Sequence, residues 1–147
     1  APIILLGDVT DAGDVRRIAD AALGALQRVD ILVNAAGGSR PTTVDAADAV
    51  WEEAVALNFS AARRMTQALL PAMQAQGWGR VINFSGSMEP RAVNAATAAK
   101  AALRSSSGAA HSASKSRAPA VAASPAGPES AACADLRAVR VLAPFCV

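Results

Sequence analysis

Short apolar runs alternate through residues 1–103 with longer segments in which apolar side chains recur at helical spacing. The runs that predict strands lie at residues 3–6, 31–33 and 80–84, and the helical segments cover about 14–26, 45–76 and 92–103. Strands that alternate with helices in this way pack into a parallel sheet. The pattern predicts an α/β fold, a partial doubly wound (Rossmann-like) parallel sheet with helices on both faces.

The pattern changes after Leu103. Between Leu103 and Leu136 the one large aliphatic residue is Val121, set among Ser, Ala, Pro and Gly. Such a segment buries too little apolar surface to offset the entropy lost on ordering. We therefore expect two parts: a folded domain at residues 1–103, and a low-complexity tail at 104–147, disordered or non-native, whose residues 139–142 could add one strand. GC-rich DNA read out of frame gives this composition, so a frameshift is one hypothesis for the tail.

Composition and charge narrow the function classes. The net charge of +2 is too small to indicate binding to nucleic acid or to an anionic membrane. Cys133 and Cys146 suit neither a disulfide framework nor a metal site. The chain has no apolar run of membrane-spanning length and no signal-like start. We therefore expect a cytoplasmic location, with no nucleic acid, membrane or metal as partner.

Polar residues and glycines follow each of the three strands. In a doubly wound sheet, ligands bind beyond the carboxyl ends of the strands. The segments at these ends are Gly7-Asp8-Val9, Asn34-Ala35-Ala36-Gly37 and Asn83-Phe84-Ser85. Each has an ordinary structural interpretation too, because aspartate caps helices, serine forms turns and a lysine on an alanine-rich helix is usually solvated. Their common order and placement nevertheless predict a binding site.

In this order, residues 3–103 resemble the short-chain dehydrogenase/reductase family, most closely its 3-oxoacyl-carrier-protein reductase branch. The pair Asp8-Val9 resembles the family's adenine-contacting pair. The turn Asn34-Ala35-Ala36-Gly37 resembles the family's Asn-Asn-Ala-Gly turn beside the cofactor ribose, with Ala35 in place of the second Asn. The resemblance implies that these residues, together with Lys100, bind NAD or NADP, and that residues 1–103 are part of a dinucleotide-binding domain.

The same resemblance implies three catalytic residues. Asn58 matches the asparagine of the family's catalytic tetrad, Ser85 the catalytic serine, and Lys100 the lysine of the Tyr-x-x-x-Lys motif. The spacing to the motif leaves Ser87 as an alternative to Ser85. The implied reaction is hydride transfer between a nicotinamide cofactor and a small carbonyl or alcohol substrate. The family's helix pairing implies a homo-oligomer.

Two features depart from the family pattern. The chain has no tyrosine, and Ala96 stands four residues before Lys100, where the family has its proton-donating tyrosine. The family's glycine-rich pyrophosphate turn would precede residue 1, so we expect impaired cofactor binding and no turnover by the chain as written. The alternatives are a non-catalytic Rossmann-fold protein for binding or assembly, and a flavodoxin-like or receiver-like domain, which would not explain the second and third strand ends together.

Overall fold

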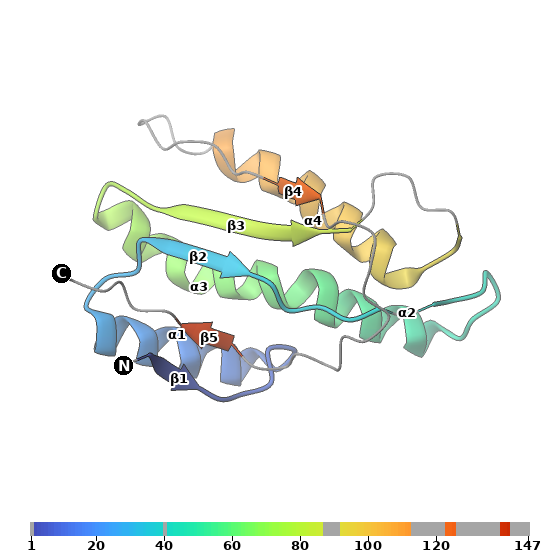
Figure 1. Cartoon of the computed structure of the whole chain (residues 1–147), viewed down its shortest axis with the longest axis horizontal. Coiled ribbons are helices and arrows are strands. Elements are labelled where there is room, and N and C mark those ends of the chain that lie inside the picture. The colour runs from blue at the N-terminus through green and yellow to red at the C-terminus, as the bar shows by residue number, and fades with distance from the viewer. Residues whose placement is uncertain (1, 40, 87–91, 113–122, 126–138, 142–147) are drawn as a thin grey trace.

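The computed structural model describes residues 2–39, 41–86, 92–112, 123–125 and 139–141 (Figure 1). Its elements run β1 (Ile3–Leu5), α1 (Ala12–Leu26), β2 (Ile31–Asn34), α2 (Asp48–Val55), the π-helical segment η1 (Ala56–Ser60), α3 (Ala61–Ala75), β3 (Arg80–Ser85), α4 (Ala95–Ser112), β4 (Ala123–Pro125) and β5 (Val139–Val141). The predicted strands and helices all form. The α/β class is thereby confirmed.

The central sheet has three parallel strands in the order β2-β3-β4. Its register places Asn34 opposite Asn83. The first strand does not join this sheet, because β1 pairs antiparallel with β5. The prediction of one parallel sheet is therefore wrong for β1. The physical reason is that no described strand bridges β1 and β2, so the backbone groups of β1 bond to the C-terminal strand instead.

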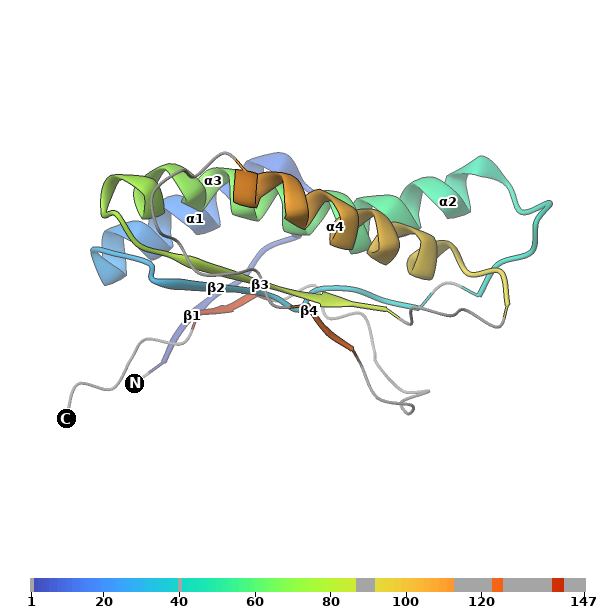
Figure 2. The ribbon, with the colours of Figure 1, turned by 90° about the horizontal axis from the view of Figure 1, so that it is seen from above.

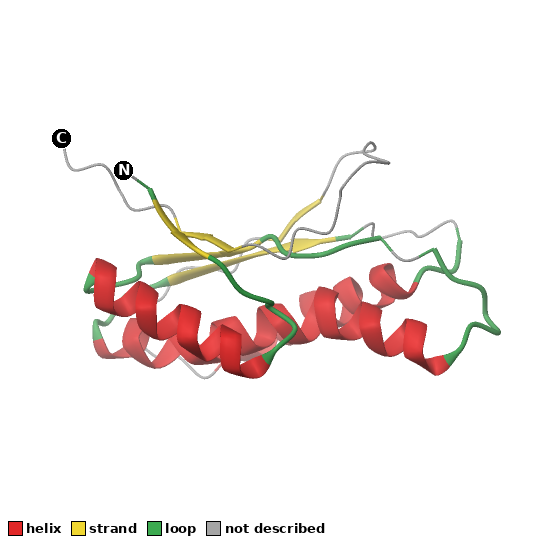
Figure 3. Cartoon of the chain, turned by 90° about the horizontal axis from the view of Figure 1, so that it is seen from below, coloured by secondary structure: helices red, strands yellow, loops and turns green. Residues whose placement is uncertain are grey.

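The described helices lie on one face of the sheet, as Figures 2 and 3 show. Crossovers between parallel strands are right-handed, so connections that advance across a sheet in one direction put their helices on the same side. The predicted second layer of helices is not among the described residues. Ile31, Val33 and Phe84 alternate along their strands with buried residues and are 52%, 49% and 44% exposed, so they lie on the face opposite the core. Because this second face is also apolar, the strand sequences read as continuous apolar runs, like those of strands buried on both faces.

Helix α1 shows how local sequence sets an element. The Asp11 side chain accepts a hydrogen bond from the Asp14 N–H at 2.8 Å and caps the helix. The helix ends at Gln27, which takes the left-handed conformation (φ 62°) and donates its N–H to the Leu23 carbonyl. The buried face of α1 carries Val15, Ile18, Ala19 and Ala22. The first three of these pack with Leu57, Met65, Leu69 and Met73 in the core between helices and sheet.

The predicted helix at residues 45–76 is one continuous helical stretch, built from α2, η1 and α3. Periodicity does not predict the π-helical turn at Ala56–Ser60. Such turns insert one extra residue and are frequent at functional sites. Here the turn carries Asn58.

None of the helices in the described parts of the chain combines the length and the apolar character that a membrane span needs.

Helix α4 continues past Leu103 to Ser112, into the segment expected to be a tail. Alanine has the highest helix propensity, which extends a helix without large aliphatic residues. The Ser106 and Ser107 hydroxyls donate hydrogen bonds to the Leu103 carbonyl at 2.8 and 2.9 Å, so these polar side chains are satisfied within the helix. Strand β4, beyond the helix, pairs with β3 although its sequence carries no strand signal. The two-part division of the chain stays a prediction.

Candidate functional site

Residues from three separate elements meet just beyond the carboxyl end of β2. The Lys100 side chain, from α4, donates a hydrogen bond from Nζ to the Ala36 carbonyl at 3.0 Å. The Asn58 amide, from η1, bonds to both backbone groups of Gly38: Oδ1 accepts its N–H at 3.1 Å and Nδ2 donates to its carbonyl at 3.1 Å. Three of the predicted site residues are thus brought together, although they lie far apart in the sequence.

Gly37 lies at the point of closest approach. A Cβ atom at this position would lie 2.8 Å from Asn58 Oδ1 and 3.0 Å from Lys100 Nζ. Real Cβ contacts are not this short, so any other residue would displace a side chain. Because the Asn58 amide is 2% exposed, it has little room to move. The glycine in the predicted cofactor turn is therefore required by the packing of the turn.

The Asn58 side-chain amide forms all of its hydrogen bonds with backbone groups. Besides Gly38, Nδ2 donates to the Ala54 carbonyl one turn earlier at 3.0 Å. Both amide hydrogens and the amide oxygen thus have partners within the protein. The side chain ties the turn after β2 to the helix that follows it, so its geometry indicates a positioning role and leaves the amide no free donor.

A second polar chain crosses the sheet beneath this cluster, through two asparagines at matched register. Asn34 Nδ2 donates to Asn83 Oδ1 at 2.8 Å and to Thr66 Oγ1 of α3 at 3.1 Å. Asn83 Nδ2 in turn donates to Ser107 Oγ of α4 at 2.9 Å. Both asparagines are 7% exposed. We call Thr66, Asn34, Asn83 and Ser107 the amide chain.

Of the amide chain, sequence reasoning selected Asn34 alone. The sequence places Asn83 at a strand end without predicting a role for it, and it predicts no role for Thr66 or Ser107. A signal did exist for Asn83, because an asparagine ends the apolar part of both β2 and β3 and buried amides require partners. No sequence signal would have found Ser107, which lies in the polar segment after Leu103.

The end of β3 contributes small residues beside Lys100. Ser85 is 8% exposed, and a Cβ at Gly86 would lie 3.6 Å from Lys100 Cβ. Ala96 lies one helical turn before Lys100 and is 7% exposed. The alternative serine, Ser87, lies outside the described residues. At the position where the family has its tyrosine, this protein therefore has the buried methyl group of Ala96.

The electrostatics of the site are dominated by burial. Burial lowers the pKa of the Lys100 ammonium below its usual value of 10.5, because charge is less well solvated there. The two ion pairs of the described residues, Arg17–Asp14 and Arg28–Asp30, do not involve it. No group of acidic, cysteine or histidine side chains that could hold a metal occurs in the described parts of the chain.

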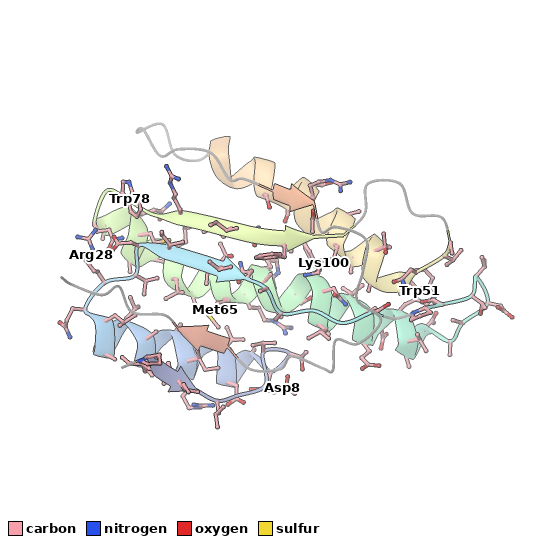
Figure 4. All side chains as sticks on the ribbon, in the orientation of Figure 1. Asp8, Arg28, Trp51, Met65, Trp78 and Lys100 are labelled. Carbon is pink, nitrogen blue, oxygen red and sulfur yellow. The ribbon has the colours of Figure 1, made fainter. Side chains whose placement is uncertain are left out.

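Asp8, the first residue of the predicted pair Asp8-Val9, lies beyond the end of β1, below Lys100 in the view of Figure 4. Its Oδ1 and its backbone N–H bond to residues close in the sequence. Asp8 Oδ1 accepts from the N–H and Oγ1 of Thr10 at 2.8 and 2.7 Å, and the Asp8 N–H donates to Asp14 Oδ2 at 2.8 Å. Val9 is buried. These bonds form the turn that leads into α1, as the structural interpretation of Asp8 expects.

One long-range contact ties this turn to the rest of the molecule. Arg64 of α3 donates from Nη1 to the Thr10 carbonyl at 2.8 Å. Arg17 also donates from Nη2 to the Leu6 carbonyl at 2.9 Å. Bonds from α1 and α3 therefore fix the backbone at the β1 end.

Comparison with known proteins gives one consistent result. The family model described as short chain dehydrogenase matches residues 2–136. Nodulation protein G of Azospirillum brasilense is 39% identical over 80 residues, which are 54% of this chain and 32% of that protein. D-threitol dehydrogenase of Mycolicibacterium smegmatis is 35% identical over 79 residues, 53% of this chain and 30% of that protein. The chain thus matches about a third of the length of these curated relatives.

Solved structures agree with the sequence matches. A metagenomic short-chain oxidoreductase in complex with NADP superposes with a TM-score of 0.67 at 31% identity, covering 72% of this chain and 50% of that one. The β2–β3 core and its helices are therefore an arrangement found in known dehydrogenase structures.

Proposed function

Since the chain belongs to the short-chain dehydrogenase family, we propose that it is the dinucleotide-facing central part of an oxidoreductase that interconverts small carbonyl and alcohol compounds. The observation that carries this proposal is the convergence of Lys100, Gly37 and Asn58 at the carboxyl end of a parallel strand. The match covers about a third of the relatives, so the activity, substrate and partners of a whole protein are part of the proposal.

The residues around Gly37 suit NAD or NADP. The bare backbone at Ala35, Ala36 and Gly37 lets a ribose approach closely, and the Lys100 ammonium supplies donors for hydroxyl groups there. At the β1 end, we propose that Asp8 and Val9 contact the adenine ring, as the family resemblance implies. The bound cofactor would supply or accept the hydride. The protein's own part is to bind, orient and exclude water.

For the catalytic roles we propose that Ser85 orients the carbonyl oxygen, Asn58 holds the turn, and Lys100 binds the cofactor. Ala96 has no proton to donate. A second function is favoured by that one residue: a non-catalytic member that binds dinucleotide without turnover. A general acid/base group typically raises the reaction rate by about 10²–10⁴. A chain without one should therefore bind dinucleotide but turn over substrate far more slowly than a complete enzyme.

A pair of variants tests these functions. We expect NADPH to bind the chain weakly in a fluorescence titration, and a ketone panel to be reduced no faster than without protein. Ala96→Tyr should raise the reduction rate by about 10²–10⁴, and Ala96→Phe, of the same size without the hydroxyl, should not. Equal rates for the two variants, with both folded by circular dichroism, would contradict the proposed geometry. Absence of any NADPH binding would contradict the proposed cofactor site.

We also propose a homo-oligomer, formed through the side of the molecule that carries α2 and the start of α4. Val55 and Val93, at these two places, are 40% and 41% exposed. Exposed apolar side chains on neighbouring elements favour a partner. Sedimentation at increasing concentration tests this, and a mass that stays monomeric would contradict it.

A further inference from the structure

Ser107, at which the amide chain meets α4, lies seven residues after Lys100 on the same helix. Seven residues are close to two helical turns, so both side chains leave the same face of α4. We propose that Ser107 and Asn83 are positioning residues, which fix α4 against the sheet so that Lys100 stands at the cofactor turn. The inference rests on the proposed function, because it takes Lys100 as the cofactor-binding lysine.

The hydrogen bonds at Ser107 have a defined direction. Asn83 Oδ1 accepts from Asn34, so the amide hydrogens of Asn83 are left for an acceptor on α4. Ser107 Oγ accepts from Asn83 Nδ2 at 2.9 Å and donates its own hydrogen to the Leu103 carbonyl at 2.9 Å. Asn83 is buried, so an Nδ2 group left without an acceptor would destabilise this arrangement. A hydroxyl at position 107 therefore satisfies a strand residue and a helix carbonyl together.

Two contacts between β3 and α4 agree in spacing. Along β3, Asn83 and Gly86 are three residues apart, which is about 10 Å of strand. Along α4, Ser107 and Lys100 are seven residues apart, which is about 10.5 Å of helix. A Cβ at Gly86 would lie 3.6 Å from Lys100 Cβ, so α4 also lies against the end of β3. Because the two elements run in opposite directions (Figure 1), the Asn83–Ser107 bond fixes α4 where Lys100 passes the strand end.

The apolar contacts of α4 specify its rotation weakly. Its buried apolar side chains are Ala95, Ala96, Ala99 and Leu103, three of which are single methyl groups. A shift of one residue moves a helix by about 1.5 Å and turns it by about 100°, and a smooth face of methyl groups opposes such a shift little. A buried polar pair is satisfied in one register alone. The Asn83–Ser107 bond thus supplies the specificity that the alanines lack.

The amide chain and Lys100 together close a ring. Lys100 Nζ bonds to the Ala36 carbonyl at 3.0 Å, and Ala36 lies two residues after Asn34 on the same strand end. Asn34 then connects through Asn83 to Ser107, which returns the ring to α4. The helix is thus held at two points by the segment that forms the cofactor turn. Loss of the Ser107 bond leaves Lys100 as the remaining link of this ring, on a helix that is free to shift.

NMR of the lysine side chain tests the proposal without any cofactor. The chain has two lysines, Lys100 and Lys115, so the full chain labelled with ¹⁵N-lysine gives two ammonium signals, and Lys100→Met identifies which is which. Spectra are taken at mildly acidic pH and low temperature, and the chain in guanidinium chloride gives the reference for an ammonium without a fixed partner. We expect Ser107→Ala to move the Lys100 signal most of the way to this reference. Ser107→Thr keeps the hydroxyl and should restore the signal.

Ser105→Ala is the matched control on the same helix. Ser105 is exposed, and its hydroxyl donates along the helix to the Ala101 carbonyl at 3.2 Å, as Ser107 does to Leu103. It should leave the Lys100 signal in place. A shift in Ser107→Ala no larger than in Ser105→Ala overturns the proposal. If circular dichroism shows Ser107→Ala to be unfolded, Ser107→Cys replaces it with the same two outcomes, because a thiol keeps the volume but accepts weakly.

A double-mutant cycle on NADPH binding separates positioning from a general structural effect. Ser107→Ala should weaken NADPH binding several-fold in the unchanged chain and leave it unchanged in a Lys100→Met background, because its effect passes through Lys100. Equal weakening in both backgrounds overturns the proposal. If the unchanged chain binds no NADPH, the proposed cofactor site is contradicted, and the Lys100 signal still decides whether Ser107 positions that side chain.

Discussion

The end of β1 and the end of β2 are both polar, yet their contacts differ in range. At the β1 end, Asp8 bonds to Thr10 and Asp14, partners two and six residues away. At the β2 end, Asn58 reaches Gly38 across 20 residues, and Lys100 reaches Ala36 across 64. Apart from the Arg64 bond to the Thr10 carbonyl, these bonds at the β1 end join sequence neighbours, whereas those at the β2 end exist only when the fold is complete. Substitutions at the β2 end should therefore lower the free energy of unfolding more than comparable substitutions at the β1 end.

The largest difference is expected between two glycines. Gly37→Ala puts a Cβ against the buried Asn58 amide at 2.8 Å, whereas Gly7→Ala puts one against side-chain ends, the exposed Arg17 Nη2 at 2.8 Å and the buried Ile18 Cδ1 at 2.9 Å. A flexible side-chain end can move, and a fully bonded amide cannot. We expect Gly37→Ala to lower the free energy of unfolding by about 3 kcal/mol, the upper part of the usual range for overpacking. Denaturant unfolding measures both variants, and an equal or larger loss in Gly7→Ala would contradict the comparison.

A smaller loss is expected in the amide chain. Asn34→Ala leaves Asn83 Oδ1 without its buried donor, and this should cost about 2 kcal/mol of unfolding free energy. Thr10→Val removes a hydroxyl bond at the β1 end and should cost about 1 kcal/mol or less. A double-mutant cycle of Asn34→Ala with Asn83→Ala should show coupling of about 0.5–3 kcal/mol. Additive effects of these two substitutions would mean that the asparagines do not act as a pair.

Lys100 should give a pH-dependent difference at high pH. Its folded pKa lies below its usual 10.5, so between the two values the unfolded chain binds more protons and the Lys100 contribution to stability rises with pH. Lys100→Met removes this titration. The stability of the unchanged chain relative to Lys100→Met should therefore increase as the pH approaches 10.5. A difference that is constant across alkaline pH would show that burial does not shift this amine.

The smallest effect is expected from Asp14 at the β1 end. The Arg17 hydrogen bond, followed by the Asp8 N–H, holds the pKa of the Asp14 carboxyl below its usual value of 3.8. Its stabilising contribution is therefore present above pH 3.8 and is lost as the pH falls through the lower, folded pKa. Because the group is exposed, solvent screening keeps the contribution slight. Acid unfolding curves of Asp14→Asn and the unchanged chain should differ slightly above pH 3.8 and converge below it, and a gap that widened toward acid would contradict this.

Much of the fold follows from the sequence because its signals are local. Apolar runs predicted β1, β2 and β3, and helical spacing predicted α1. The π-helical turn escaped prediction, since a single inserted residue leaves the apolar period almost unchanged. The end of α4 and the strand β4 also escaped, because alanine propensity and pairing with β3 replace apolar burial there.

The candidate site divides in the same way. Asn34, Gly37, Asn58 and Lys100 were selected as residue types that suit the chemistry, and the structure places the last three in one cluster. The sequence does not predict that the Asn58 amide hydrogen-bonds to both backbone groups of Gly38. It could not tell either that Asn34 pairs with Asn83, because that bond depends on the register of two strands.

By itself, the sequence determined which segments become strands and helices, and which strand ends carry polar residues, since propensity and periodicity act over a few neighbours. Only the tertiary structure decided that β1 pairs with β5, that the described helices share one face, and that Lys100 meets the Ala36 carbonyl. Those outcomes depend on contacts between distant residues, whose geometry is set by the packing of the whole sheet and its helices.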